Sequence, residues 1–138
     1  MTYMLDTHAV SALMKGDPQV AAKLRAANRG DISIPQPVIA EIAYGIERLP
    51  RSNRRQVLRE RLELVCMELP RAEWTDTVSE RFGLIKATLE HKGNRIEDFD
   101  AAIAAHALAS GATLVTANLA DMVRVPGLKV VDWASGEA

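Results

Sequence analysis

Four acidic side chains stand close to the ends of apolar segments, in a pattern typical of a metal-dependent site. Asp6 directly follows the apolar run of residues 3–5, and Asp121 comes soon after the run of residues 113–116. Glu41 and Asp100 each fall in the first turns of an expected helix. Several carboxylates in one pocket repel one another unless a divalent cation neutralises them. The pattern therefore favours a cation site, provided that the fold brings the four acids together.

The residue types narrow the choice of metal. The chain has a single cysteine, Cys66, and contains neither a CxxC nor an HExxH motif. Carboxylates are hard oxygen ligands, which suit Mg²⁺ or Mn²⁺ better than zinc. A site of this kind supports phosphoryl chemistry, because the metal activates water and stabilises the departing oxygen.

Each acid also has a purely structural interpretation. Asp6 is placed to cap the helix that follows it, and Asp98 is the expected N-cap of an alanine-rich helix. Asn118 and Asp121 have the spacing of a capping-box variant. Glu41 could be simply exposed on its helix. The joint placement of the acids, and no single one of them, carries the hypothesis.

Alternating strands and helices must position these residues. Strands are expected over residues 3–5, 32–34, 113–116 and 128–131, with a further short strand over 67–69. Helices are expected through residue 14, over 17–29, from Pro37 through Ile46, after a cap at Ser52 or Asn53, and over 75–91 and 98–110. Such alternation predicts βαβ units with a parallel sheet. In parallel sheets, functional groups gather at the carboxyl ends of the strands.

Length and composition agree with one globular domain over residues 1–138. Hydrophobic residues make up 48% of the chain and charged residues 25%, which is ordinary for a soluble protein. With 17 Lys and Arg against 18 Asp and Glu, the net charge gives no sign of nucleic-acid binding, although a local patch would suffice. The lone Cys66 argues for a reducing compartment. Without a signal peptide or a long apolar segment, the expected location is cytoplasmic.

Five blocks of the chain resemble PIN domains of the VapC toxin type. They lie in the family's order and are residues 4–7, 39–46, 98–107, 114–121 and 126–133. The resemblance implies a PIN-like three-layer α/β sandwich, with a central parallel sheet flanked by helices. It also implies a Mg²⁺- or Mn²⁺-dependent endoribonuclease that acts as the toxin of a type II toxin–antitoxin pair and leaves 5′-phosphate and 3′-hydroxyl ends.

The resemblance assigns the catalytic and metal-binding roles to Asp6, Glu41, Asp100 and Asp121. Thr7, Thr116 and Asn118 are supporting candidates, since the family places a threonine after the first acid and an asparagine after the fourth block's strand. Most VapC-type chains have an asparagine where this chain has His8. This histidine is expected to hydrogen-bond locally or to contact substrate phosphate.

The implied partners are RNA, with transfer RNA as a plausible substrate, a cognate antitoxin, and a second toxin copy within a larger complex. Positive charge concentrates in one segment, at Arg48, Arg51, Arg54, Arg55, Arg59 and Arg61. These arginines could form a solvated helix face, contact RNA, or dock an acidic antitoxin segment. A tail helix of the antitoxin is expected in a groove near Ile46 and Leu58.

Two other functions are compatible with acids at the strand ends of an α/β fold. A phospho-receiver domain needs an acceptor Asp after a central strand and a late Lys. No Asp lies between Asp31 and Asp76, and no Lys lies between Gly93 and Leu128. A catalytically weak module that only binds RNA or a partner is the remaining alternative.

His106 lies six residues after Asp100 on one helix, about 600° of rotation away, and is expected to be a packed residue outside the site.

Overall fold

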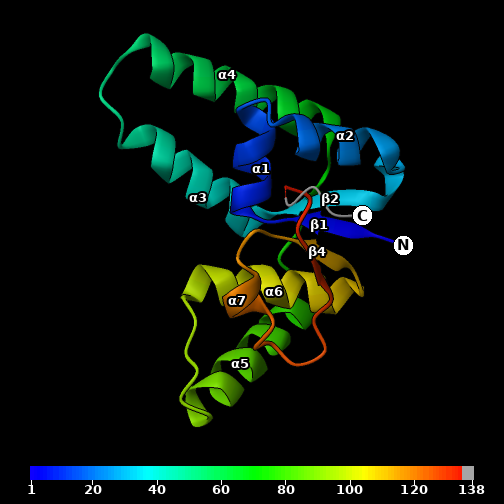
Figure 1. Ribbon diagram of the computed structural model, residues 1–138. Helices are drawn as coiled ribbons and strands as arrows, with labels where there is room; N and C mark the ends of the chain where they lie inside the picture. Colours follow the sequence, from blue (N-terminus) through cyan, green and yellow to red (C-terminus); the bar gives the residue numbers. More distant parts are fainter. Residues whose placement is uncertain (135–138) are drawn as a thin grey trace.

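A five-stranded parallel sheet forms the centre of the protein, as seen in the computed structural model, which describes residues 1–134 (Figure 1). The strands lie in the order β3-β2-β1-β4-β5. Their bounds are β1 Tyr3–Leu5, β2 Ile32–Pro35, β3 Arg71–Ala72, β4 Thr113–Val115 and β5 Val130–Val131. All four pairings are parallel. The inner strands are short and almost wholly buried, as expected for a sheet covered on both faces.

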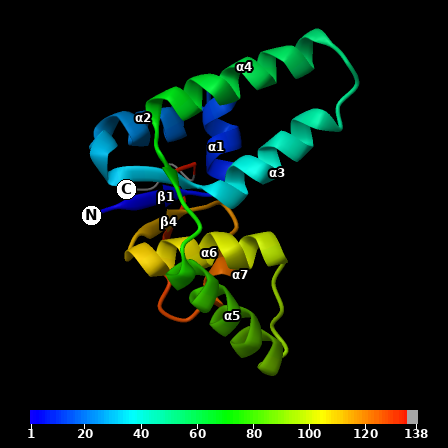
Figure 2. The ribbon, with the colours of Figure 1, turned by 180° about the vertical axis from the view of Figure 1, so that it is seen from behind.

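Helices cover both faces of this sheet, so the three-layer α/β sandwich expected from the sequence is confirmed. One layer contains α1 (Thr7–Met14), α2 (Pro18–Ala26), α3 (Gln36–Glu47) and α4 (Asn53–Glu68). The other contains α5 (Asp76–His91), α6 (Asp98–Ser110) and the short α7 (Leu119–Met122). The two opposite views in Figures 1 and 2 show the same division. Within residues 1–134, no helix combines the length and apolar character needed to cross a membrane.

Small and aliphatic side chains build the core, since the chain has few aromatic residues. The apolar stripe expected on α3 is observed, with Val38, Ile42 and Ile46 all buried. Helix α6 buries an unbroken run from Ala101 to Ala107, and its small alanines allow close packing against its neighbours. Gly111 ends α6 in the left-handed region at φ 64°, the conformation that favours glycine at a helix C-terminus.

The expected strand over residues 67–69 is wrong. Helix α4 continues to Glu68, and the Leu69 amide still donates to the Val65 carbonyl at 2.9 Å. Apolar residues here belong to the last helical turn, and the strand begins only after Pro70, at β3. Ser52, one of the two expected caps, does cap α4 by accepting from the Arg55 amide at 3.2 Å.

Three other boundaries differ from the expectations. The helix expected over 17–29 ends at Ala26, and a 3₁₀ turn follows over Arg29–Asp31, with the Asn28 side chain accepting from the Gly30 amide. The last two strands are shorter than expected, by one residue for β4 and by two for β5. The N-cap position of α6 is Glu97, so the assignment of Asp98 as its cap is wrong. Asp98 instead pairs with Lys86, with 2.8 Å between Oδ1 and Nζ.

Candidate active site

Asp6 sits at the carboxyl end of the central strand β1, where the chain turns into α1. Only 3% of the residue is exposed, and its Oδ1 accepts from the Ala9 amide at 2.8 Å. Asp6 therefore caps α1, so its structural interpretation is confirmed. Burial raises the pKa of its carboxyl, while hydrogen bonds from Thr116 and Ala9 and the nearby His8 oppose that rise.

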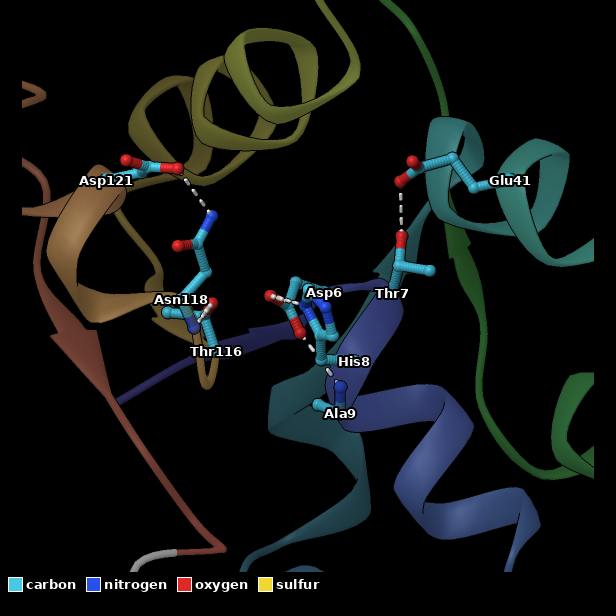
Figure 3. A network of polar contacts seen from close by, with 8 residues as sticks. All are labelled: Asp6, Thr7, His8, Ala9, Glu41, Thr116, Asn118 and Asp121. Carbon is cyan, nitrogen blue, oxygen red and sulfur yellow. Dashed lines mark hydrogen bonds and ion pairs between the residues drawn. The ribbon is translucent and has the colours of Figure 1, made fainter. Parts of the chain in front are cut away.

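Glu41 reaches the same edge of the sheet from α3. The Thr7 hydroxyl, at the start of α1, donates a hydrogen bond to Glu41 Oε1 (Figure 3). This contact joins residues 34 positions apart in the chain and ties the first turn of α1 to α3. Thr7 was a supporting candidate by resemblance, and the structure gives it a defined contact with the second acid.

Asp121 approaches from the opposite side, on α7. The Asn118 amide nitrogen Nδ2 donates to Asp121 Oδ2 at 3.3 Å, and the Asn118 backbone amide donates to the Thr116 hydroxyl at 2.9 Å. Asn118 occupies the N-cap position of α7 but makes no capping bond with its side chain. The capping-box interpretation is therefore wrong. Figure 3 shows Asn118 and Asp121 bonded to each other, with Asp6 between them and the Thr7–Glu41 pair.

Asp100, in the first turn of α6, is affected by the negative charges of the other three acids. Partial burial, together with the charges of Glu41, Asp121 and Asp6, raises the pKa of its carboxyl from 3.8 to about 6. Charges act on this group only if they lie near it. The four predicted acids, which come from four separate elements, thus converge at one edge of the sheet.

His8 lies beside Asp6 at the solvent-exposed side of the acidic centre, which comprises Asp6, Glu41, Asp100 and Asp121. Its side chain is 66% exposed, and its Nδ1 lies 3.7 Å from Asp6 Oδ2. This local contact is at an ion-pair distance and exceeds the length of the hydrogen bond expected from the sequence. The high exposure leaves much of the ring accessible to solvent beside the acids.

The donor set fits a hard divalent cation, although the acids do not yet surround a common point. Within residues 1–134, no three potential ligand side chains are already placed to hold an ion. Glu41 and Asp121 are each turned toward a protein partner, and Asp6 is engaged by its own helix. Burial and the charges of the other acids raise the pKa of Asp100, and a cation bound near it would favour its ionised form.

A groove runs away from the acids between α1, α3 and α4. It has a volume of about 330 Å³, and Thr7 and Glu41 are among its lining residues. Its lining contains the Ile46 and Leu58 side chains that the sequence placed there. Apolar and cationic groups are combined in the rest of the lining, which includes Met14, Ile42, Leu49, Lys15, Arg48 and Arg54.

The six arginines of the basic segment have different roles. Arg55 and Arg59 both pair with Glu47, and Arg61 donates to the Met14 carbonyl at 2.9 Å. Half of the predicted patch is therefore engaged within the protein. Arg48 and Arg54 line the groove, and Arg48 also lies over the Tyr44 ring at 5.8 Å from its centroid.

His106 is a packed residue, as expected. It is 1% exposed, meets the Trp74 ring edge-on with 5.6 Å between centroids, and has a pKa lowered by burial.

Sequence reasoning missed one residue beside the site. Arg124 Nη2 lies 3.5 Å from Asp121 Oδ1, and its Nη1 donates to the Arg95 carbonyl at 3.4 Å. The spacing of three residues between Asp121, on a short helix, and Arg124, in the turn that follows it, was the available signal, because residues so spaced face each other when the chain keeps turning.

Comparison with known proteins agrees with the geometry. The PIN domain family model matches residues 3–128. Ribonuclease VapC2 of Rickettsia felis is 32% identical over 135 residues, covering 96% of this chain and 98% of the relative. The tRNA(fMet)-specific endonuclease VapC of Salmonella typhimurium is 29% identical over 137 residues, with the same coverage. The crystal structure of VapBC2 from Rickettsia felis bound to a promoter DNA fragment includes a chain that matches with a TM-score of 0.86 at 29% identity, covering 96% of this chain and 99% of that one. The chain therefore belongs to the PIN domain family and, within it, to the VapC type.

Proposed function

We propose that this protein is a metal-dependent endoribonuclease that serves as the toxin of a toxin–antitoxin pair. The observation that carries the proposal is the placement of acids at the carboxyl edge of the sheet: Asp6 follows β1, the adjacent Thr7 binds Glu41, and Asn118, soon after β4, binds Asp121. Full-length similarity to proteins named ribonuclease VapC supports the same activity. The four acids are suited to metal-dependent cleavage of a phosphodiester, since carboxylates are the hard oxygen ligands that Mg²⁺ and Mn²⁺ prefer.

Asp6, Glu41 and Asp100 would hold the cation, and Asp121 would close the site. When bound, the cation supplies a water of lowered pKa beside the scissile phosphate. One of the four carboxylates accepts the proton that the attacking water loses. Attack of the water oxygen on phosphorus would break the bond from phosphorus to the 3′ oxygen, which would take up a proton from solvent, so that the products carry 5′-phosphate and 3′-hydroxyl ends.

The substrate is RNA, and transfer RNA is the class suggested by the relative named as a tRNA(fMet)-specific endonuclease. The partner is a cognate antitoxin, in keeping with the VapBC complexes among the similar structures. The groove beside Glu41 combines an apolar lining with three cationic side chains, so it suits an amphipathic tail that carries acidic residues. A basic side chain of that tail could enter the acidic centre and replace the cation. A toxin homodimer within the complex is part of the same proposal.

Cleavage of RNA by the purified protein tests the proposal. After treatment with EDTA, the protein should cut single-stranded RNA only when Mn²⁺ or Mg²⁺ is restored, and mapping should find 5′-phosphate ends. Asp100→Asn should lower the rate by about a hundredfold or more, because it removes a charged ligand while keeping the shape. Asp98→Asn is the matched control, since it makes the same change two residues away on the exposed side of the turn.

Two outcomes would contradict the proposed metal-dependent nuclease activity. One is cleavage that continues unchanged in excess chelator, and the other is wild-type activity in Asp100→Asn. RNA binding without any cleavage in Mn²⁺ would favour the alternative function, a catalytically weak module that sequesters RNA or a partner.

A further inference from the structure

Asp121 differs from the other three acids in having a permanent cationic neighbour. Among the ion pairs of residues 1–134, it is the only one of the four acids that pairs with an arginine or lysine, and Arg124 Nη2 lies 3.5 Å from its Oδ1. Its other oxygen, Oδ2, accepts from Asn118 at 3.3 Å. Both carboxylate oxygens of Asp121 therefore face protein donors.

Arg124 is held in place by a second contact from another part of the fold. Its Nη1 donates to the Arg95 carbonyl at 3.4 Å, across 29 residues of sequence. This bond links the end of α7 to the connection between α5 and α6. The guanidinium is thus fixed between a carbonyl and a carboxylate, a geometry that its planar set of N–H groups can satisfy from two sides.

The pair is also open to exchange. The side chains of Arg124 and Asp121 are each 40% exposed, and a hollow of about 420 Å³, lined by Arg95 and Asp121 among others, lies beside them. Half-exposed ion pairs are worth little in free energy, so a divalent cation can compete for the same oxygen.

We propose that Arg124 is a built-in counter-ion for Asp121, which keeps this carboxylate out of the cation site until a metal ion displaces the guanidinium. A cation then meets three acids that pair with no arginine or lysine within residues 1–134, Asp6, Glu41 and Asp100, before it can engage the fourth. Arg124 is in this sense a positioning residue, since it acts through Asp121. The inference rests on the proposed cation site, but the contact itself can be tested without any metal.

Mn²⁺ binding, measured by calorimetry on the EDTA-treated and dialysed protein, tests the competition. Arg124→Gln should bind Mn²⁺ about threefold to fivefold tighter than the wild type, because an exposed ion pair of modest strength no longer competes. Arg95→Gln is the matched control: it removes the same charge from the same hollow but leaves the backbone carbonyl that holds Arg124. Its effect should stay below about twofold, since salt screens charges that are not in contact.

Melting in EDTA tests the contact with no cation present. In the otherwise wild-type protein, Arg124→Gln should lower the melting temperature, because the charge of Asp121 then repels the other carboxylates without a cationic partner. The same substitution should have a clearly smaller effect in an Asp121→Asn background, where only the contact with the Arg95 carbonyl is lost, and Arg124→Lys should restore part of the wild-type melting temperature.

Equal gains in Mn²⁺ affinity for Arg124→Gln and Arg95→Gln would overturn the inference, as would a gain that persists in Asp121→Asn. An unchanged melting temperature for Arg124→Gln in EDTA would also overturn it. Failure of the proposed function looks different: no variant would bind Mn²⁺, and the wild type would not cleave RNA, while the melting experiment would still decide the role of Arg124.

Discussion

At the scale of single residues, Asp100 shows how burial and neighbouring acids disfavour an ionised carboxylate in the metal-free site. Its carboxyl is partly buried and faces three other acids, which together raise its pKa to about 6. The unfolded chain has no such environment, so its carboxyl keeps a pKa near 3.8. Between these two values the metal-free folded protein binds more protons than the unfolded chain. The contribution of Asp100 to the stability of the metal-free protein therefore falls as the pH rises from about 4 to about 6.

We predict that Asp100→Asn stabilises the metal-free protein at pH 7 by about 1–2 kcal/mol, less than the full pKa shift implies because the side chain is only partly buried. The gain should shrink toward pH 4, where the folded-state carboxyl is protonated and the pH approaches the pKa of the unfolded chain, so the two states differ less in bound protons. Urea unfolding in EDTA at pH 4.5 and pH 7 measures it. Asp98→Asn should show no such gain, since Lys86 lowers the pKa of Asp98. A variant at Asp100 that is less stable than the wild type at pH 7 would contradict the clustered-acid arrangement.

Thr7 illustrates a residue that acts through another. We predict that Thr7→Val, which removes the hydroxyl bonded to Glu41, lowers RNA cleavage about tenfold to a hundredfold, the usual cost of losing a group that orients a metal ligand. Thr7→Ser keeps the hydroxyl and should retain most of the activity. Rates at saturating and limiting Mn²⁺ show whether the loss lies in metal binding. If the Val and Ser variants cut RNA equally well, the hydroxyl does not orient Glu41.

At the scale of elements, α3 and α4 carry both a catalytic acid and the surface for a partner. Glu41 and Ile46 of α3 line one groove together with Arg54 and Leu58 of α4. The basic segment is only partly available there, because Glu47 engages Arg55 and Arg59. Arg54 is thus a better probe of the groove than Arg55. Changing Arg55 to Glu would place a second carboxylate next to that of Glu47.

We predict that Arg54→Glu slows association with the cognate antitoxin, and slows it more at low than at high ionic strength. Opposite charges across a binding surface accelerate encounter, and salt screens that attraction. Stopped-flow or surface-based association rates at about 20 mM and 300 mM salt span the range over which screening changes most. Arg51→Glu makes the same charge change at an exposed position outside the groove and is the control. Equal rates for the wild type and Arg54→Glu at low salt would show that the groove does not steer the antitoxin.

At the scale of the whole molecule, the order of strands creates the site. The chain passes from β1 outward to β2 and β3, and then returns to β4 on the other side of β1. Helices α1–α4 cover one face of the sheet and α5–α7 the other (Figures 1 and 2). Acids from both layers therefore meet at the point where the direction of winding reverses, which is where open parallel sheets place their ligands.

We predict that Mn²⁺ stabilises the whole fold through this site. A ligand that binds only the folded state at about a hundred times its dissociation constant adds about 2.7 kcal/mol, which raises the melting temperature by several degrees. The shift should be present in the wild type and in Asp98→Asn, and nearly absent in Asp100→Asn. Thermal unfolding with Mn²⁺ and with EDTA measures it. A shift of equal size in all three proteins would place the ion elsewhere.

The sequence by itself determined the features that depend on short-range pattern. Apolar runs predicted the inner strands β1 and β4, and alternation of apolar and polar residues predicted β2. The stripe of α3 predicted its buried face, and Gly111 marked the end of α6. It also placed Asp6 and Asp100 next to element ends, and the resemblance joined them to Glu41 and Asp121. Pattern failed at residues 67–69, because a short apolar run is compatible with either a strand or the last turn of a helix.

Only the tertiary structure decided which of these residues touch. The Thr7–Glu41 bond, the link from Arg124 to Asp121 and Arg95, and the pairing of Glu47 with Arg55 and Arg59 all join different elements or different turns of the chain. Whether a capping-type residue caps also depended on its neighbours: Asp6 does, whereas Asn118 turns to Asp121. The physical reason is that side-chain hydrogen bonds and ion pairs act over a few ångströms, and only the packing of both helical layers on the sheet brings these groups within that distance.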